Sequence, residues 1–333
     1  MQSIKGVFRT GAARAVCARP GFTPAPVARI GSSKPPSGRR GVMFRMVCPA
    51  VAVFLVSVTG HADLYVWRDA QGEMKYSEAS PGGGVRDVRK IKTTVKFQCT
   101  FSGSPADCGL HLQAKAQSRA SIEKVARDGR AGLRLRTEPG DDNVASSGDM
   151  ERTDMYLSQA DTGCYEGREQ WWEHSVLFPD DYVFPSASAK YSSSWNIVFD
   201  FHNSAPGPWQ ANFHTEVVTL SPDPGNPLLN PDPPILRFRG YGGEKSGDGA
   251  FAAPIGPVVK NAWYEFVYHV RWSSGPDGYF DAWVNGVKKL SHKGPTLYAG
   301  QGCYLKLANY HVPYRQASSV IHGNVIRHDV AAP

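Results

Sequence analysis

The sequence predicts an all-β protein: a β-sandwich of the jelly-roll kind preceded by a small N-terminal β-hairpin domain. Short runs of alternating apolar and polar residues recur from about residue 95 onward, whereas only Ala116–Asp128 has the pattern of an amphipathic helix. The dipeptide Asn285-Gly286 separates two of these runs and is a strong signal for a two-residue hairpin turn. Many antiparallel strands with few helices bury their apolar faces best as two packed sheets.

The first 62 residues have the composition of a leader, because they contain nine Lys or Arg and no Asp or Glu. Arg45 precedes the apolar run Val47–Val58, and Gly60-His61-Ala62 has the small-x-small pattern of a cleavage site. We therefore predict a secretory signal peptide that ends near Ala62, with residues 1–42 as an over-long gene start or an extension. The apolar run is too short to span a bilayer comfortably, so a secreted or periplasmic protein without a membrane span is expected.

Removing the leader changes the charge balance of the chain. Nine of the 37 basic residues lie in it, which leaves 28 basic against 30 acidic residues in the predicted mature protein. Such a chain is not a general binder of polyanions, and nucleic acid is not implied. Any anionic ligand needs a local cluster of positive groups.

Export implies an oxidising compartment, and four cysteines remain after cleavage: Cys99, Cys108, Cys164 and Cys303. Three pairings are open. We favour Cys99–Cys108, which would close a short loop, together with Cys164–Cys303; the alternative is free buried thiols. The sequence has no Cys-x-x-Cys spacing and no Asp-x-Asp-x-Asp run, so no metal site is predicted, although a structural calcium stays open.

The mature chain divides into a small hairpin and a large sandwich. Two short alternating runs flank Asp69–Gly72 and predict a β-hairpin, and Pro81–Gly84 follows as a linker, so residues 63–84 form the small domain. The large domain covers residues 95–330, and its segment Ser221–Pro234 is expected to be a long irregular loop. Its strand candidates are Glu169–Phe178, Ser194–His202, Asn212–Leu220, Ile235–Arg239, Trp263–Trp272, Tyr279–Val284 and Cys303–Tyr310.

The last of these strands has an unusual polar face. Alternation places Tyr304, Lys306, Ala308 and Tyr310 on one side of Cys303–Tyr310 and leucines on the other. A lysine and a tyrosine four residues apart suit a groove in which a cation makes the ionisation of a nearby phenol less costly. The alternative is a half-exposed strand with a packed tyrosine and a solvated lysine.

Other strands also collect polar side chains on one face. Alternation in Ser194–His202 assigns Trp195 and Ile197 to the apolar face of Phe199 and Phe201. These side chains together predict a concave polar groove for an extended polar chain such as a polysaccharide, the alternative being a solvated outer sheet. The polar groups, strand by strand, are Arg152 and Asp154; Asn196, Asp200 and His202; Asn212, His214 and Glu216; and Glu265, His269 and Arg271.

Four motifs, in this order along the chain, resemble those of polysaccharide lyases related to heparin lyase I and glucuronan lyase, with a more distant likeness to jelly-roll alginate lyases. Together they cover about residues 130–315, and the last is the most specific. The hairpin resembles a small Tyr-x-Trp-x-Asp-x-x-Gly domain of exported proteobacterial proteins, and the resemblance implies a concanavalin-like sandwich. The four motifs are Glu151–Asp154, Trp171–Tyr182, Phe199–Asn203 and Tyr304–Tyr310.

The resemblance implies a secreted lyase that cleaves a uronic-acid polymer by β-elimination and leaves a 4,5-unsaturated uronate. It implies that Arg152 neutralises the uronate carboxylate, that His202 is the base, and that Tyr310 is the acid or both acid and base. Lys306 would stabilise the ionised Tyr310 phenol by its charge. His214 is a reserve candidate for the base.

Substrate contacts are expected from Asp200, His214, Asn212, Arg271 and Trp172. Asp200 stands where the family has a glutamine, and an ionised carboxylate there would repel a uronate, so it would instead hold the base or pair with an arginine. The resemblance implies an anionic uronate polysaccharide as the partner, no required cofactor and a monomer.

Two other functional classes stay open. A non-catalytic carbohydrate-binding module would use the same groove, with Trp171, Trp172 or Trp209 stacking on sugars. A glycoside hydrolase ranks third, because it needs two nearby carboxylates and the Glu-x-Asp-x-Glu strand of jelly-roll glucanases is missing. Convergence of His202 and Tyr310 would favour the lyase.

Overall fold

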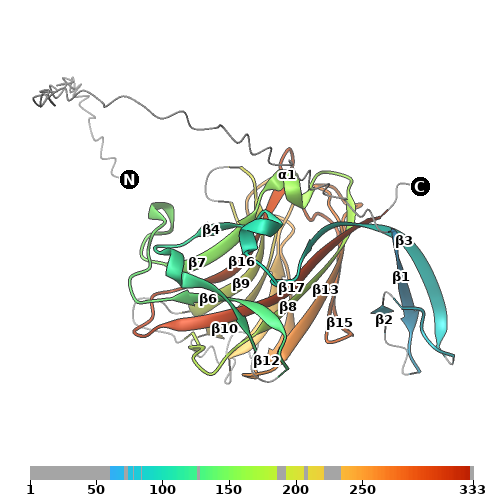
Figure 1. Ribbon diagram of the computed structural model, residues 1–333. Helices are drawn as coiled ribbons and strands as arrows, with labels where there is room; N and C mark the ends of the chain where they lie inside the picture. The colour runs from blue at the N-terminus through green and yellow to red at the C-terminus, as the bar shows by residue number, and fades with distance from the viewer. Residues whose placement is uncertain are drawn as a thin grey trace, which may run out of the picture. The chain divides into compact units, whose positions relative to one another are not determined.

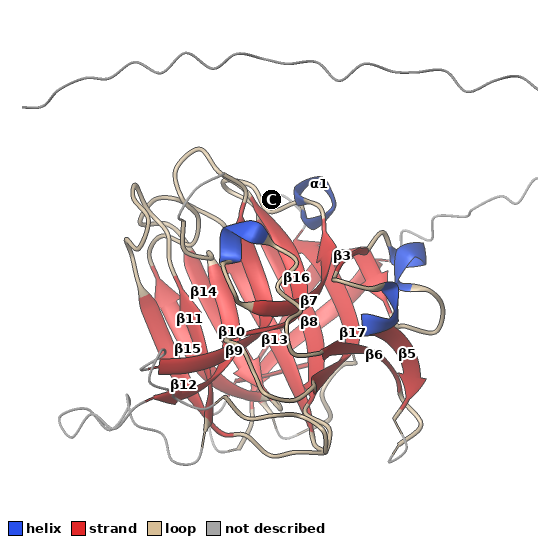
Figure 2. Cartoon of the chain, turned by 90° about the vertical axis from the view of Figure 1, so that its left-hand side faces the viewer, coloured by secondary structure: helices blue, strands red, loops and turns tan. Residues whose placement is uncertain are grey.

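The computed structural model describes residues 61–330 except 71–73, 78, 84, 126–127, 186–192, 206–208 and 221–233. The predicted signal peptide before residue 61 and most of the predicted loop Ser221–Pro234 lie outside the described residues. Strands make up almost all of the regular structure, and helices are confined to short segments (Figure 2). The predicted all-β jelly roll is confirmed.

One sheet of seven strands carries the polar groups that the sequence singles out. We call it sheet B. All its neighbouring strands are antiparallel, and β16 lies in its middle, between β9 and β7 (Figure 1). In spatial order it contains β12 (Phe251–Pro257), β11 (Ile235–Gly240), β10 (Phe213–Leu220), β9 (Ser193–Asn203), β16 (Cys303–His311), β7 (Glu151–Leu157) and β4 (His111–Gln113).

The other sheet, sheet A, has ten strands. Eight follow one another in space, while β6 (Ala131–Thr137) pairs with β17 and β5 (Ala120–Lys124) pairs with β6. The one short α-helix, α1 (Gln159–Thr162), precedes β8. The eight consecutive strands are β15 (Val287–Lys293), β14 (Tyr279–Val284), β13 (Trp263–Arg271), β8 (Glu169–Leu177), β17 (Ser318–Val330), β3 (Arg86–Cys99), β1 (His61–Arg68) and β2 (Met74–Ser77).

The core between the two sheets is rich in aromatic residues. Phe213 stacks on Phe280 with ring centroids 4.0 Å apart, which joins β10 of sheet B to β14 of sheet A. Trp172 and Phe201 make a similar contact at 5.3 Å. Because large rings contribute most of the buried apolar area, these contacts fix the sheets face to face and leave the outer face of sheet B for polar groups.

The N-terminal hairpin forms where it was predicted, but it is part of sheet A. Strand β1 pairs with β3, which in turn pairs with β17 at the centre of the sheet. Leu64 and Val66 of β1 pack with Trp171 and Trp283 in a second apolar cluster. The hairpin therefore covers apolar side chains on the outer face of sheet A instead of standing apart from the sandwich.

Two expectations from local pattern are wrong. Within Ala116–Asp128 the described residues form a short 3-10 turn (Gln117–Arg119) and strand β5, because pairing with β6 overrides helix propensity. Strand β17 was missed, since Gly323-Asn324 interrupts its alternation and its pairing with β8 shifts register there. The seven strand candidates and the Asn285-Gly286 hairpin are confirmed.

Both favoured disulfides are present. Cys99–Cys108 closes a nine-residue separation, and its Cα atoms lie 5.6 Å apart. Cys164–Cys303 joins the segment before β8 to the first residue of β16, with Cα atoms 5.3 Å apart. The second disulfide therefore anchors the start of the strand that carries Tyr304 and Lys306.

Candidate active site

An irregularity in β9 decides which of its side chains reach the outer face of sheet B. Val198 is an additional residue in the ladder to β10, so the alternation of β9 reverses there. Trp195 and Ile197 consequently line the same cavity as His202. The expectation that they share the apolar face of Phe199 is wrong, and Trp195 becomes an aromatic surface of the site.

A cavity of about 290 Å³ lies on this face, where β9, β10, β11 and β16 meet. It brings together four of the predicted site residues, which come from three different strands: Asp200, His202, His214 and Tyr310. The other residues that line it are Trp195, Ile197, Trp209, Gln210, Ala211, Glu216 and Arg239.

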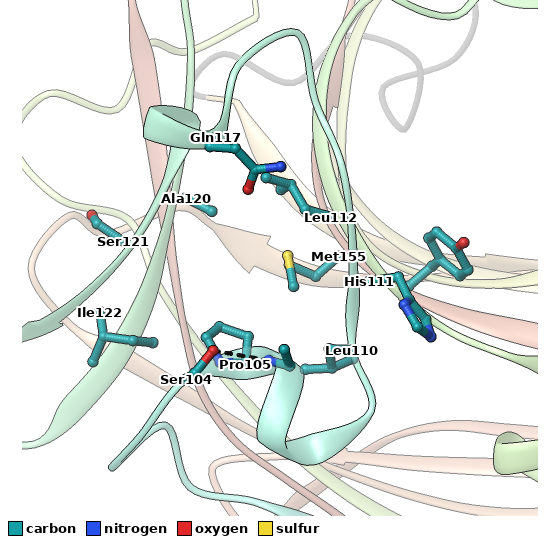
Figure 3. Close-up of a pocket in the computed structure, with 12 residues that line it drawn as sticks. Ser104, Pro105, Leu110, His111, Leu112, Gln117, Ala120, Ser121, Ile122 and Met155 are labelled. Atoms are coloured by element: carbon teal, nitrogen blue, oxygen red, sulfur yellow. Dashed lines mark hydrogen bonds between the residues drawn. The ribbon is translucent and has the colours of Figure 1, made fainter. Parts of the chain in front are cut away.

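Two further cavities continue across the sheet towards β4. The nearer one, of about 370 Å³, is lined by Tyr304, Lys306 and Tyr156 among others. The farther one, of about 560 Å³, also includes Tyr156, and Figure 3 shows Met155 and other mostly apolar side chains around it. Polar character therefore concentrates in the first two cavities.

His202 and Tyr304 stand where the first two cavities adjoin. They are paired in the ladder between β9 and β16, and their rings stack with centroids 5.0 Å apart. His202 Nδ1 lies 3.0 Å from the carbonyl oxygen of Asn203. Because a carbonyl only accepts, the neutral ring donates from Nδ1 and keeps its lone pair on Nε2. The arrangement gives a histidine able to accept a proton beside a phenol able to donate one.

Two cations share one buried carboxylate next to this pair. Asp154 Oδ2 lies 3.4 Å from Lys306 Nζ and 3.5 Å from Arg152 Nη1. Burial raises the pKa of Asp154, although both cations oppose this. Burial also disfavours the charge on Lys306, but Asp154 prevails and raises the lysine's pKa. Arg152 and Lys306 are only 5 % and 6 % exposed, so both are charges held in a fixed place.

The two tyrosines of β16 have different neighbours. The Arg152 guanidinium lies 3.9 Å from the centre of the Tyr310 ring, and Trp195 packs edge-on against the same ring at 4.9 Å. Lys306 Nζ lies 5.6 Å from the centre of the Tyr304 ring. The expected partnership of Lys306 with Tyr310 is therefore wrong: Arg152 accompanies Tyr310, and Lys306 accompanies Tyr304.

A second charged group lies on β10 and β11. Glu216 contacts His214 Nε2 at 3.4 Å and accepts a hydrogen bond from Arg237 Nε at 2.8 Å. Burial opposes its ionisation, but His214 and Arg237 together lower the pKa of Glu216 to about 2. Arg239 lies on the cavity wall two residues beyond Arg237. Sequence reasoning missed both arginines, although their alternation on a predicted strand was a usable signal.

Three predicted substrate contacts do not lie on this face. Arg271 is in sheet A, where its Nε donates to Asp277 at 3.2 Å. Trp172 is fully buried in the core between the sheets. Asn212 is also fully buried, immediately before β10. Alternation gives the face of a strand but not the sheet to which the strand belongs, which is why Arg271 was misassigned.

Asp200 has a different neighbour from the one expected. It pairs with Lys306 in the ladder between β9 and β16, so a lysine rather than an arginine balances its charge. Within the described residues no three His, Cys, Asp or Glu side chains are grouped as a metal site would require. The same part of the chain contains no helix that is long and apolar enough to cross a membrane.

Comparison with known proteins gives one family. Residues 93–325 match the family model described as "Polysaccharide lyase". No curated protein matches the chain.

Several solved structures are similar. One is an endo-β-1,4-glucuronan lyase from the fungus Trichoderma reesei, with 15% identity, a TM-score of 0.49, and coverage of 69% of this chain and 93% of that one. An alginate lyase in complex with an alginate trisaccharide has 13% identity, a TM-score of 0.46, and coverage of 71% and 98%. A family 7 alginate lyase has 10% identity, a TM-score of 0.44, and coverage of 80% and 95%.

Proposed function

The chain belongs to the polysaccharide lyase family, and we propose that it cleaves a uronic-acid-containing polysaccharide by β-elimination, leaving a 4,5-unsaturated uronate at the new end. The observation that carries this proposal is the stacked pair of His202 and Tyr304 on the outer face of sheet B. Buried cations beside the pair favour an anionic sugar, because a fixed positive charge stabilises the negative charge that grows in the transition state.

Each step of the reaction has a residue assigned to it. Arg152 and Lys306 face the uronate carboxylate and make the proton on C5 easier to remove. His202 Nε2 takes that proton, the C5–H electron pair becomes the C4=C5 double bond, and the bond from C4 to the leaving oxygen breaks. Tyr304 protonates the leaving oxygen. A proton then returns from His202 to Tyr304, directly or through water, which restores both groups.

Tyr304 fits the role of the acid better than Tyr310. Burial raises the pKa of the Tyr304 phenol, and Lys306 offsets this only in part, so the phenol is protonated at neutral pH. It also lies against His202, so both groups can reach the same sugar. We therefore assign Tyr310 to binding, where its ring, Trp195 and Arg152 form one wall of the cavity.

Asp200 is compatible with an anionic substrate in this arrangement. Its partner Lys306 is charged, and Arg239 adds a further cation on the wall of the same cavity. We propose that Asp200 accepts hydrogen bonds from sugar hydroxyls and does not contact the uronate carboxylate.

The test is the ultraviolet absorbance of the unsaturated product, with glucuronan, alginate, heparin, heparan sulfate and hyaluronan offered separately. A rise with one polymer is expected. Tyr304→Phe is expected to lower the rate by at least about 100-fold, the usual worth of a general acid, and Tyr310→Phe by less than about tenfold. Binding without any rise in absorbance would leave a carbohydrate-binding module. A larger loss in Tyr310→Phe would return the acid role to Tyr310.

A further inference from the structure

Strand β3 carries a concentration of positive charge that the catalytic groove does not use. Of its 14 residues five are basic and one, Asp87, is acidic, in a chain that has slightly more acidic than basic residues once the leader is set aside. All five basic side chains are exposed. We call them the β3 basic strip: Arg86, Arg89, Lys90, Lys92 and Lys96.

Pairing in the sheet does not explain these charges. Lysines often protect the free edge of a sheet from association with other strands, but β3 is an interior strand, paired with β1 on one side and β17 on the other. Charge pairing explains them only in part. Lys90 Nζ lies 2.6 Å from Asp63, whereas no acidic side chain in the described part of the chain makes an ion pair with Arg89, Lys92 or Lys96.

An aromatic side chain belongs to the same surface. In the ladder between β1 and β3, Tyr65 is paired with Lys90, and Lys90 Nζ lies 5.8 Å from the centre of the Tyr65 ring. Leu64 and its partner Ile91 point to the opposite side, into the second apolar cluster. The hairpin thus has one face that packs on sheet A and another that presents cations and a phenol to solvent.

This surface is separate from the groove. It lies on sheet A, whereas the groove occupies the outer face of sheet B, and Figure 1 draws β1 and β3 well to the side of β9 and β16. Arg86, Arg89, Lys90 and Lys92 also precede residue 93, where the family match begins. The β3 basic strip is therefore a feature of this chain's N-terminal extension.

We infer that the β3 basic strip is an auxiliary binding surface for an anionic polysaccharide. The partner follows from charge complementarity: a row of exposed cations fits a flexible polyanion, and neighbouring aromatic groups fit the apolar faces of sugar rings. The identification of the polyanion with the polymer that is cleaved rests on the proposed function. The surface would hold the chain near the groove and raise its local concentration there.

The experiment measures binding of the full-length chain to soluble polyuronates, with Tyr304→Phe present in every variant to suppress turnover. The strip variant is Arg89→Gln/Lys92→Gln/Lys96→Gln. The matched control, Lys124→Gln/Lys289→Gln/Lys293→Gln, removes the same charge from three exposed lysines on β5 and β15. We expect the strip variant to bind about fivefold or more weakly at low salt and the control to bind as the parent does. The slope of log Kd against log salt should fall by about two, from about 0.7 per lost contact with a single-stranded polyanion.

Three results would overturn the inference. The first is equal binding by the strip and control variants, and the second is equal loss in both. The third is unchanged polyuronate binding with lost binding to vesicles of anionic phospholipid, which would identify a membrane surface instead. None of these depends on cleavage. If the parent with Tyr304 intact formed no unsaturated product, the proposed function would fail, while weaker polyuronate binding by the strip variant alone would still support the surface.

Discussion

The outer faces of the two sheets carry similar charged patterns but differ in what those charges contact. In β10 of sheet B, His214 and Glu216 are two residues apart, and in β13 of sheet A, His269 and Arg271 are two residues apart. Those of β10 line a cavity. Those of β13 are held by neighbours on their own sheet, and the N-terminal hairpin covers part of that face.

The contacts of His269 show how sheet A satisfies its charges. Its Nε2 lies 2.8 Å from Glu169 and 3.1 Å from the Tyr279 hydroxyl, and its ring stacks on Trp171 at 4.0 Å. The hydrogen bond from His269 lowers the pKa of Glu169 despite burial. Similar residue patterns therefore produce a self-contained surface on one sheet and a binding groove on the other, and the difference is set by neighbouring strands.

The strongest test of this comparison replaces one histidine on each sheet. His202→Gln removes the proposed base, so we expect the rate to fall by about 10²- to 10⁴-fold. His269→Gln should leave the rate within about twofold of the parent, because the groove lies on the other sheet. The measurement is the initial rate of unsaturated-product formation at saturating substrate.

The folded state of both variants is checked by their thermal unfolding. If His269→Gln lost as much activity as His202→Gln while remaining folded, the face of sheet A would be part of the reaction and the comparison would be wrong.

A buried ion pair and an exposed one give the next largest contrast. Arg237→Met leaves Glu216, which is 4 % exposed, with His214 as its remaining partner. Breaking a buried pair costs about 3–5 kcal/mol; because His214 remains, we expect about 2–3 kcal/mol of lost unfolding free energy. Arg271→Met breaks the exposed pair with Asp277, for which we expect less than about 1 kcal/mol. Urea unfolding of both variants measures the difference, and equal costs would contradict it.

The sequence predicted the strands and both disulfides more reliably than it predicted the site. Alternation and turn signals are local, so they located β8, β10 and β14 and the Asn285-Gly286 hairpin. Whether a side chain lines the groove depends on bulges and on the order of strands in space, which are not local. That is why Trp195 was assigned to the core and Arg271 to the groove, and why Tyr310 rather than Tyr304 was expected to act with His202.

Histidines buried beneath sheet B should make the fold sensitive to acid. Burial lowers the pKa of His322 to about 3 and that of His311 to about 4. Both stay neutral in the folded state while the unfolded chain takes up protons near its ordinary value of about 6.5, so stability is complete above that pH and declines as the pH falls towards 3. Each histidine contributes up to about 1.4 kcal/mol per pH unit in this window. Urea midpoints at pH 7, 6 and 5 measure the slope.

His322→Gln supplies the control for this prediction. Glutamine can still donate to the Ala308 carbonyl, which His322 Nε2 contacts at 3.1 Å, but it cannot take up a proton. The pH slope should fall by about one histidine's share. An unchanged slope would assign the acid sensitivity to other groups.

The smallest effect expected is on substrate affinity, and it compares one arginine from each sheet. Arg239 lies on the cavity wall and is exposed, so Arg239→Gln should raise KM by no more than about fivefold, equivalent to about 1 kcal/mol, with kcat unchanged. The increase should shrink at high salt, because screening weakens exposed charge pairs. Arg271→Gln removes the same charge from sheet A and should leave KM unaltered at every salt concentration. If both variants shifted KM equally, the substrate would respond to the net charge of the protein and not to the groove, and the distinction between the two faces would lose its electrostatic basis.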